Sequence, residues 1–187
     1  MSVDLKSDLL ERSLPSEWYT SDKVFCLEQE HIYSKEWMCA GREECLPSVG
    51  DHKVLEVAGE SVIVVRNESE TLRAFYNVCR HRGAQLCSTE PNLHGIKLKG
   101  GVINGKIIAC PYHAWSYNLD GNLLNTPHLN ITEDFAHENH ALYPVGCEVW
   151  GGFFFLNLTP KQAPDFDASI SMFAERYRRY PLEKLIT

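Results

Sequence analysis

The sequence lacks a run of apolar residues long enough to span a membrane, a block of lysine or arginine, and an apolar leader near its start. A membrane span needs about 20 consecutive apolar residues, so we expect no membrane partner. The formal net charge of −7 disfavours binding to nucleic acids or anionic lipid surfaces. With a charged opening, Met1–Asp8, these absences predict a soluble protein of the cytoplasm.

The sequence also has no internal repeat and no low-complexity segment. Hydrophobic residues make up 44% and charged residues 23% of the chain, which are ordinary values for a globular protein. The length of 187 residues suits one domain with an extension. Seven cysteines, an odd number without an export signal, disfavour a disulfide framework. We therefore expect the cysteines to be metal ligands or buried thiols.

Helices are expected near both ends of the chain. Apolar residues three and four apart predict a helix over residues 22–40, and Gly41 follows as a plausible stop. The same spacing over residues 165–180 predicts a second, amphipathic helix that ends at Pro181.

Between these helices the hydrophobic period is that of β-strands. Short runs rich in Val, Ile and Phe alternate with polar or glycine-containing turns. No helical crossover separates the strands, which indicates a mainly β, antiparallel core. The expected strands cover residues 53–57, 61–66, 72–77, 106–109, 145–150 and 153–158.

Two short motifs each offer one thiolate and one imidazole: Cys79-Arg-His81 and Cys110-Pro-Tyr-His113. Each motif follows an expected strand, so two loops can direct all four side chains to a shared centre. A tetrahedral zinc ion accepts two Cys and two His, but structural zinc sites prefer two to four residues between paired ligands. A [2Fe–2S] cluster with two Cys on one iron and two His on the other uses the same four residues. The close spacing of Cys79 and His81 favours the cluster.

The segments 77–87 and 110–121, which contain these motifs, resemble the Rieske domain of ring-hydroxylating oxygenase α subunits. Flanking residues extend the resemblance over nearly the whole chain. They are Leu14–Thr20, Glu36-Trp37, Gly50-Asp51, Val64–Arg66 and Gly151–Asn157.

The resemblance implies a Rieske-type antiparallel β-sandwich with a cluster-binding subdomain. It implies an N-terminal helical arm (1–45), the Rieske domain (46–158), and a C-terminal helix (159–187) leading toward a catalytic domain that lies beyond this chain.

The same resemblance places Cys79 and Cys110 on the buried iron of a Rieske-type [2Fe–2S] cluster, and His81 and His113 on the outer iron. Neutral imidazoles donate less charge than thiolates, so they raise the reduction potential above that of an all-cysteine cluster. Rieske proteins of high potential carry a serine where this chain has Trp115. The missing hydroxyl predicts a potential toward the low end of the Rieske range, which runs from about −150 to +300 mV.

The implied function is one-electron transfer within an oxygenase of the aromatic-ring-hydroxylating type. A flavin reductase or ferredoxin donates the electron, and a mononuclear iron in the oxygenase catalytic domain accepts it. Assembly into an oligomer is compatible with this reading. An autonomous ferredoxin-like carrier and a zinc-binding scaffold remain alternatives, and neither substrate nor catalytic residue is predicted.

Several features depart from the family pattern or stay unassigned. The segment Ser88–Gly105 is longer than in the resembling oxygenases, and we interpret it as an inserted surface loop. Ala114 stands where the family commonly has glycine. Asp134-x-x-His137-x-x-His140 has the residue types of a ferrous iron site, but we expect a solvated segment.

Two arginines flank His81, and five cysteines have no assigned ligand role. Arg80 and Arg82 are expected either to dock an acidic electron donor or to serve the local structure. The remaining cysteines are expected to be buried; they are Cys26, Cys39, Cys45, Cys87 and Cys147.

Overall fold

The computed structural model describes residues 13–88, 101–103, 106–127 and 135–185. Its main elements are α1 (Asp22–Glu28), β1 (Met38–Arg42), β2 (His52–Val57), β3 (Glu60–Arg66), β4 (Leu72–Tyr76), β5 (Gly101–Ile103), β6 (Ile107–Ala109), β7 (Ser116–Asn118), β8 (Leu123–Asn125), β9 (Pro144–Trp150), β10 (Phe153–Asn157) and α2 (Phe166–Tyr177). Short helical turns cover Ser16–Tyr19, Gln29–Tyr33, Glu43–Cys45, His137–His140 and Leu182–Lys184.

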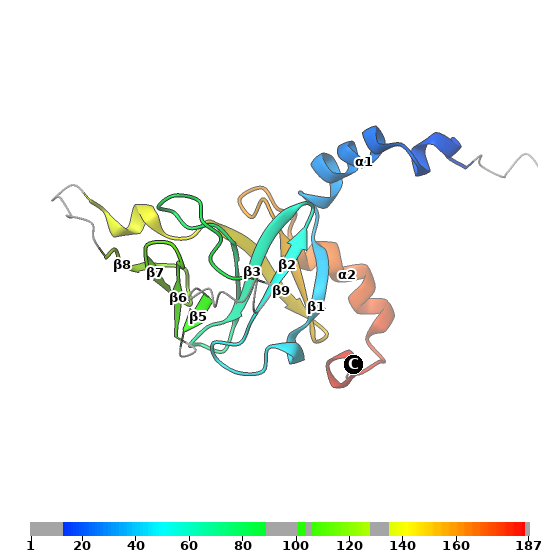
Figure 1. Ribbon diagram of the computed structural model, residues 1–187. Helices are drawn as coiled ribbons and strands as arrows, with labels where there is room; N and C mark the ends of the chain where they lie inside the picture. The colour runs from blue at the N-terminus through cyan, green and yellow to red at the C-terminus, as the bar shows by residue number, and fades with distance from the viewer. Residues whose placement is uncertain (1–12, 89–100, 104–105, 128–134, 186–187) are drawn as a thin grey trace, which may run out of the picture.

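The strands form two antiparallel sheets, which confirms the mainly β expectation. The larger sheet has the order β1-β10-β9-β4-β3-β2, and the smaller has the order β5-β6-β7-β8. The small sheet lies at one end of the molecule, and both α1 and α2 lie toward the other end (Figure 1). Among the described residues, no helix is long and apolar enough to cross a bilayer.

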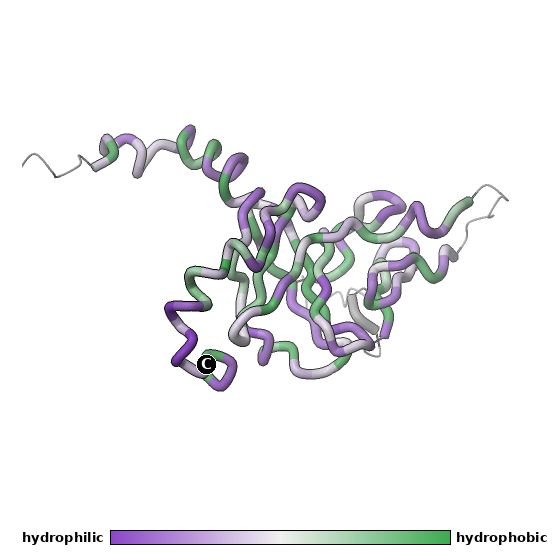
Figure 2. Tube along the Cα trace, turned by 180° about the vertical axis from the view of Figure 1, so that it is seen from behind, coloured by the Kyte–Doolittle hydropathy of each residue, from purple (hydrophilic) through white to green (hydrophobic). Residues whose placement is uncertain are grey.

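Strand β3 separates two hydrophobic cores. Side chains alternate between the two faces of a strand, so Ile63 and Val65 enter one core while Val62 and Val64 enter the other. All four are fully buried. The first core also contains Cys79 and the small-sheet residues around it, and the second lies against β9 and β10. The hydropathy colouring shows apolar and polar residues alternating along the chain (Figure 2).

The turn between β2 and β3 shows how the sequence sets the strand register. Ala58 and Gly59 both have positive φ values, 50° and 82°. A two-residue turn of this kind matches the right-handed twist of the strands it joins. Val57 therefore pairs with Glu60, and the hairpin continues in register to the pair His52 and Val65.

The expected helix over residues 22–40 is wrong beyond Tyr33. Residues 38–42 instead form β1, which pairs with β10. The apolar residues with helical spacing end at Trp37, and the sequence alone does not reveal that β10 offers an edge with which the next residues can pair. Gly41 is needed inside this strand, because a Cβ there would lie 2.9 Å from the ring of Phe154.

The C-terminal helix forms where it was expected, although it ends earlier, at Tyr177. Asp165 caps it by accepting a hydrogen bond from the backbone N–H of Ala168 at 2.7 Å. The ring of Phe166 packs against Trp37, with centroids 5.2 Å apart.

The inserted segment contains one short strand among its described residues. Residues 101–103 form β5, paired with β6, so that part of the expectation is wrong. Residues 89–100 and 104–105 lie outside the described part of the chain. The strands β7 and β8 were also missed, because three residues show little periodicity and, unlike β6, neither strand contains a β-branched residue.

Candidate metal centre

The first ligand motif lies in a tight loop after β4. The backbone N–H of Gly83 donates to the carbonyl of Cys79 at 3.0 Å, and the N–H of Cys79 donates to the carbonyl of Ala84 at 2.8 Å. Gly83 has a φ of 69°, a conformation that glycine adopts without a steric penalty. The loop therefore buries Cys79 while it leaves His81 nearer the surface.

The second motif lies in a similar loop after β6. The N–H of Ala114 donates to the carbonyl of Cys110 at 3.1 Å, and the N–H of Cys110 donates to the carbonyl of Trp115 at 2.8 Å. Ala114 has a φ of 57°, which explains why a glycine suits this position. Cys110 is buried and His113 is partly exposed, as in the first loop.

The two loops bring the four predicted residues together as two pairs. The Nδ1 atoms of His81 and His113 lie 3.2 Å apart, and their ring centroids are 4.9 Å apart. On the buried side, the Cys110 thiol contacts that of Cys79. Within the described residues, no group of three or more His, Cys, Asp or Glu side chains surrounds a single ion position.

Local electrostatics acts differently on the thiol and imidazole side chains of this site. Burial is the largest influence on Cys110 and raises the pKa of its thiol, while the backbone N–H groups of Tyr112 and His113 oppose that shift. Such N–H groups stabilise an anionic sulfur. Burial, followed by the charges of His113 and Arg82, lowers the pKa of His81. Its imidazole is therefore held neutral, as a metal ligand must be.

Tyr117 completes the buried side of the site. Its hydroxyl lies 3.3 Å from the sulfur of Cys79 and accepts a hydrogen bond from the backbone N–H of Arg80 at 3.1 Å. Because the hydroxyl oxygen already accepts a hydrogen bond from that N–H, the hydroxyl proton can point at the sulfur. Burial and the neighbouring Cys79 raise the pKa of Tyr117, so the hydroxyl remains a donor.

Asn77 holds the far side of the first loop, a role that sequence reasoning missed. Its side-chain oxygen accepts from the backbone N–H groups of Leu86 and Cys87 at 3.0 and 2.9 Å. Its side-chain nitrogen donates to the carbonyl of Cys87 at 2.7 Å and to the hydroxyl of Ser61 at 3.0 Å. The sequence offered one signal for this role: Asn77 is a polar residue between an apolar strand and a cysteine motif.

Arg80 serves the local structure. Its guanidinium donates to the carbonyls of Asn139 and Ala141 at 3.1 and 3.3 Å, and it lies 3.8 Å from the centroid of the Tyr143 ring. Arg82 is exposed beside His81. Of the two arginines, Arg82 therefore remains the candidate for contact with an electron donor.

The remaining candidates divide into three groups. Asp134 lies outside the described residues, while His137 and His140 form part of a helical turn beside the site. Cys87 is buried, and burial raises the pKa of its thiol to about 12. The expectation of buried thiols is wrong for three others, which are exposed: Cys26, Cys39 and Cys45.

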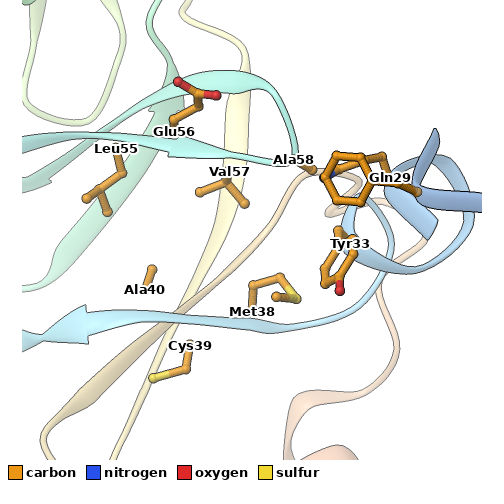
Figure 3. A pocket seen from close by; sticks show the side chains of 10 residues that line it. Gln29, Tyr33, Met38, Cys39, Ala40, Leu55, Glu56, Val57 and Ala58 are labelled. Carbon is orange, nitrogen blue, oxygen red and sulfur yellow. The ribbon is translucent and has the colours of Figure 1, made fainter. Parts of the chain in front are cut away.

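A cavity of about 330 Å³ lies apart from these loops. Gln29 and Tyr33 of the N-terminal arm, Met38 of β1, and Leu55 and Val57 of β2 line it (Figure 3). None of its lining residues belongs to the cysteine and histidine motifs. The candidate metal centre therefore does not use this cavity.

The fold and the paired loops define a class of protein. The family model of the Rieske [2Fe-2S] domain matches residues 36–136, and the chain belongs to this family. Membership implies a Rieske-type [2Fe–2S] cluster. The chain is homologous to the α subunits of Rieske oxygenases.

Two known relatives are similar to most of this chain. The carnitine monooxygenase oxygenase subunit of Escherichia coli (strain K12) is 38% identical over 148 residues, 79% of this chain and 37% of that protein. The glycine betaine monooxygenase oxygenase subunit of Chromohalobacter salexigens is 35% identical over 181 residues, 93% of this chain and 38% of that protein. The chain thus spans less than half the length of these curated relatives.

A solved structure supports the same relationship. The quaternary ammonium Rieske monooxygenase CntA in complex with L-carnitine superposes with a TM-score of 0.77 at 34% identity. The match covers 94% of this chain and 47% of that one. Because the match covers nearly the whole chain, the similarity concerns the fold and not the ligand loops alone.

Proposed function

We propose that this chain is a one-electron transfer domain whose [2Fe–2S] cluster is held by Cys79, His81, Cys110 and His113. The observation that carries the proposal is the convergence of two loops, which pairs the two thiols on the buried side and the two imidazoles toward the surface. The donor set fits a binuclear centre, with one pair for each iron. When bound, the cluster supplies reversible acceptance of one electron.

The residues around the centre suit this role. Buried thiolates stabilise ferric iron in the protein interior, and the Tyr117 hydroxyl adds a hydrogen bond to one sulfur. Partly exposed imidazoles shorten the path between the cluster and a docked partner. In this proposal a flavin reductase or ferredoxin supplies the electron, and a mononuclear iron in an oxygenase catalytic domain receives it.

The relatives extend the proposal to the parent enzyme. These relatives are named for carnitine and glycine betaine, which are quaternary ammonium compounds. We therefore propose that the parent oxygenase acts on a quaternary ammonium compound in preference to an aromatic ring. Reductase-coupled oxygenation assays of the full-length oxygenase, with L-carnitine, glycine betaine and naphthalene compared, test this point. Turnover of naphthalene alone would contradict it.

Electron paramagnetic resonance (EPR) of the anaerobically purified, dithionite-reduced protein tests the proposed cluster. We expect a rhombic signal with the low average g value of histidine-ligated clusters. Cys110→Ala and His113→Ala should abolish that signal. The matched controls Cys39→Ala and His31→Ala remove the same chemical groups from exposed positions and should keep it.

Two outcomes would overturn the proposed cluster. A wild-type protein that stays silent after reconstitution with iron and sulfide would leave the zinc-binding scaffold as the better interpretation. A Rieske signal that survives in both ligand variants would assign the cluster to other residues.

A further inference from the structure

A stack of aromatic rings extends from His81 away from the ligand pair. The indole of Trp115 lies parallel to the His81 imidazole, with centroids 4.7 Å apart and an interplanar angle of 7°. Phe135 meets the indole edge-on at 6.2 Å, and His140 meets it at 6.0 Å. Phe135 and His140 stack on each other at 4.4 Å. We call these four residues the aromatic stack.

The outer part of the aromatic stack is fixed by the first hydrophobic core and by hydrogen bonds within and to residues 136–141. Trp115 is only 4% exposed and belongs to the first hydrophobic core, against which Phe135 also packs. The His140 ring lies 3.0 Å from the carbonyl of Ala136, within hydrogen-bond distance. Hydrogen bonds from Arg80 to the carbonyls on either side of His140 hold the same segment. The indole is therefore a rigid surface.

We propose that Trp115 is a positioning residue for His81, and that Phe135 and His140 support it from behind. This inference rests on the proposed function, because it takes His81 as a cluster ligand. Parallel stacking restricts rotation of the imidazole about its bond to Cβ. The ring orientation keeps the Nδ1 atom directed toward His113, 3.2 Å away. The indole also shields one face of the imidazole from water.

This arrangement has two measurable consequences. An oxidised cluster held by two thiolates and two neutral imidazoles has no net charge, whereas the reduced form carries one negative charge. Water stabilises the charged form, so opening the Trp115 face raises the reduction potential. Freedom of the imidazole to rotate changes the coupling between its ligating nitrogen and the unpaired electron, while the coupling of His113 stays as it was.

The test compares Trp115→Leu, Trp115→Phe and Phe135→Leu with Trp37→Phe, measured in the cluster-loaded protein. Trp37 packs against Phe166, outside the aromatic stack, and serves as the matched control. The readouts are the midpoint potential and the two nitrogen couplings from pulsed EPR of the reduced protein. For Trp115→Leu we expect at least a threefold shift toward the reduced form at fixed potential, which is about 30 mV for a one-electron couple.

The pattern across the variants separates positioning from a general effect on stability. Trp115→Phe keeps a ring and should keep both couplings close to wild type, and Phe135→Leu should shift the potential in the same direction by a smaller amount. Should Trp115→Leu fail to fold, Phe135→Leu must still shift one nitrogen coupling. Unchanged potentials and couplings in the Trp115 and Phe135 variants, or an equal change in Trp37→Phe, would overturn the inference. A wild-type protein without a Rieske signal would instead overturn the proposed function.

Discussion

The hydroxyl of Tyr117 and the sulfur of Cys79, 3.3 Å apart, give the clearest prediction at the scale of a residue. A hydrogen bond to sulfur stabilises the electron-rich reduced form, so Tyr117→Phe should lower the midpoint potential. A bond worth about 1 kcal/mol corresponds to about 40 mV for one electron. Redox titration followed by EPR measures the shift.

The control for that change removes a hydroxyl elsewhere. Tyr76 donates its hydroxyl hydrogen bond to the carbonyl of Leu158 at 2.9 Å, away from the cluster sulfurs. Tyr76→Phe should therefore leave the midpoint potential unchanged. Equal shifts in both variants would show that the Tyr117 hydroxyl has no specific effect on the cluster.

Ala114 carries a second prediction at this scale, because its φ of 57° lies in the left-handed region. An alanine side chain costs about 1 kcal/mol there, which exceeds the entropy that glycine adds to the unfolded chain. Ala114→Gly should raise Tm by about 1–2 °C, measured by circular dichroism of the cluster-loaded protein.

Ala136 provides the opposite case, with an ordinary φ of −90°. Ala136→Gly should lower Tm, because glycine there only increases the entropy of the unfolded chain. The two substitutions are chemically identical, and their expected effects on Tm have opposite signs. A fall in Tm for Ala114→Gly would contradict the left-handed conformation of this loop.

At the scale of elements, the first ligand loop depends on Asn77 at the end of β4. Asn77→Ala removes four hydrogen bonds and leaves the buried N–H groups of Leu86 and Cys87 without a partner. Unsatisfied buried donors cost about 1–3 kcal/mol each, so we expect a loss of about 3 kcal/mol or more. Denaturant unfolding measures it.

Asn122 is the control for this loss, since it is exposed in the turn between β7 and β8. Asn122→Ala should change the unfolding free energy by less than about 0.5 kcal/mol. If Asn77→Ala were as mild as this control, the loop would have to be held by its remaining contacts alone.

Elements also show where sequence patterns succeed and where they fail. The run of Val and Ile predicts strand β3 correctly, because β-branched residues suit a buried strand. All of its central residues are buried, on alternating faces. The residues of β1 directly follow a segment with helical spacing, yet they pair with β10, because strand pairing depends on a partner more than a hundred residues away. Local periodicity contains no information about that partner.

At the scale of the whole molecule, the two hydrophobic cores predict different responses to cluster removal. The first core contains Cys79 and Cys110, whereas the second contains none of the four candidate ligands. Removing the iron with a chelator under reducing conditions should therefore expose the amides of both ligand loops. Hydrogen exchange followed by mass spectrometry should show protection lost there and retained in β9 and β10.

Two results would test that prediction further. Cys39→Ala, a change at an exposed thiol, should give the same exchange pattern as wild type in both the loaded and the metal-free protein. Loss of protection throughout both cores on iron removal would mean that they unfold as one cooperative unit. The domain boundaries at residues 45 and 158 remain predictions that this measurement also examines.

The sequence by itself indicated the cofactor of this protein, a Rieske-type [2Fe–2S] cluster. Two thiols and two imidazoles in closely spaced motifs predict a Rieske cluster, because ligand type and spacing are local properties of the chain. Tertiary structure alone decided what surrounds those candidate ligands: the Tyr117 hydroxyl at the Cys79 sulfur, the Trp115 ring on His81, and the Arg80 hydrogen bonds to the segment around His140. Those contacts join residues from separate elements, so only packing of the folded chain establishes them.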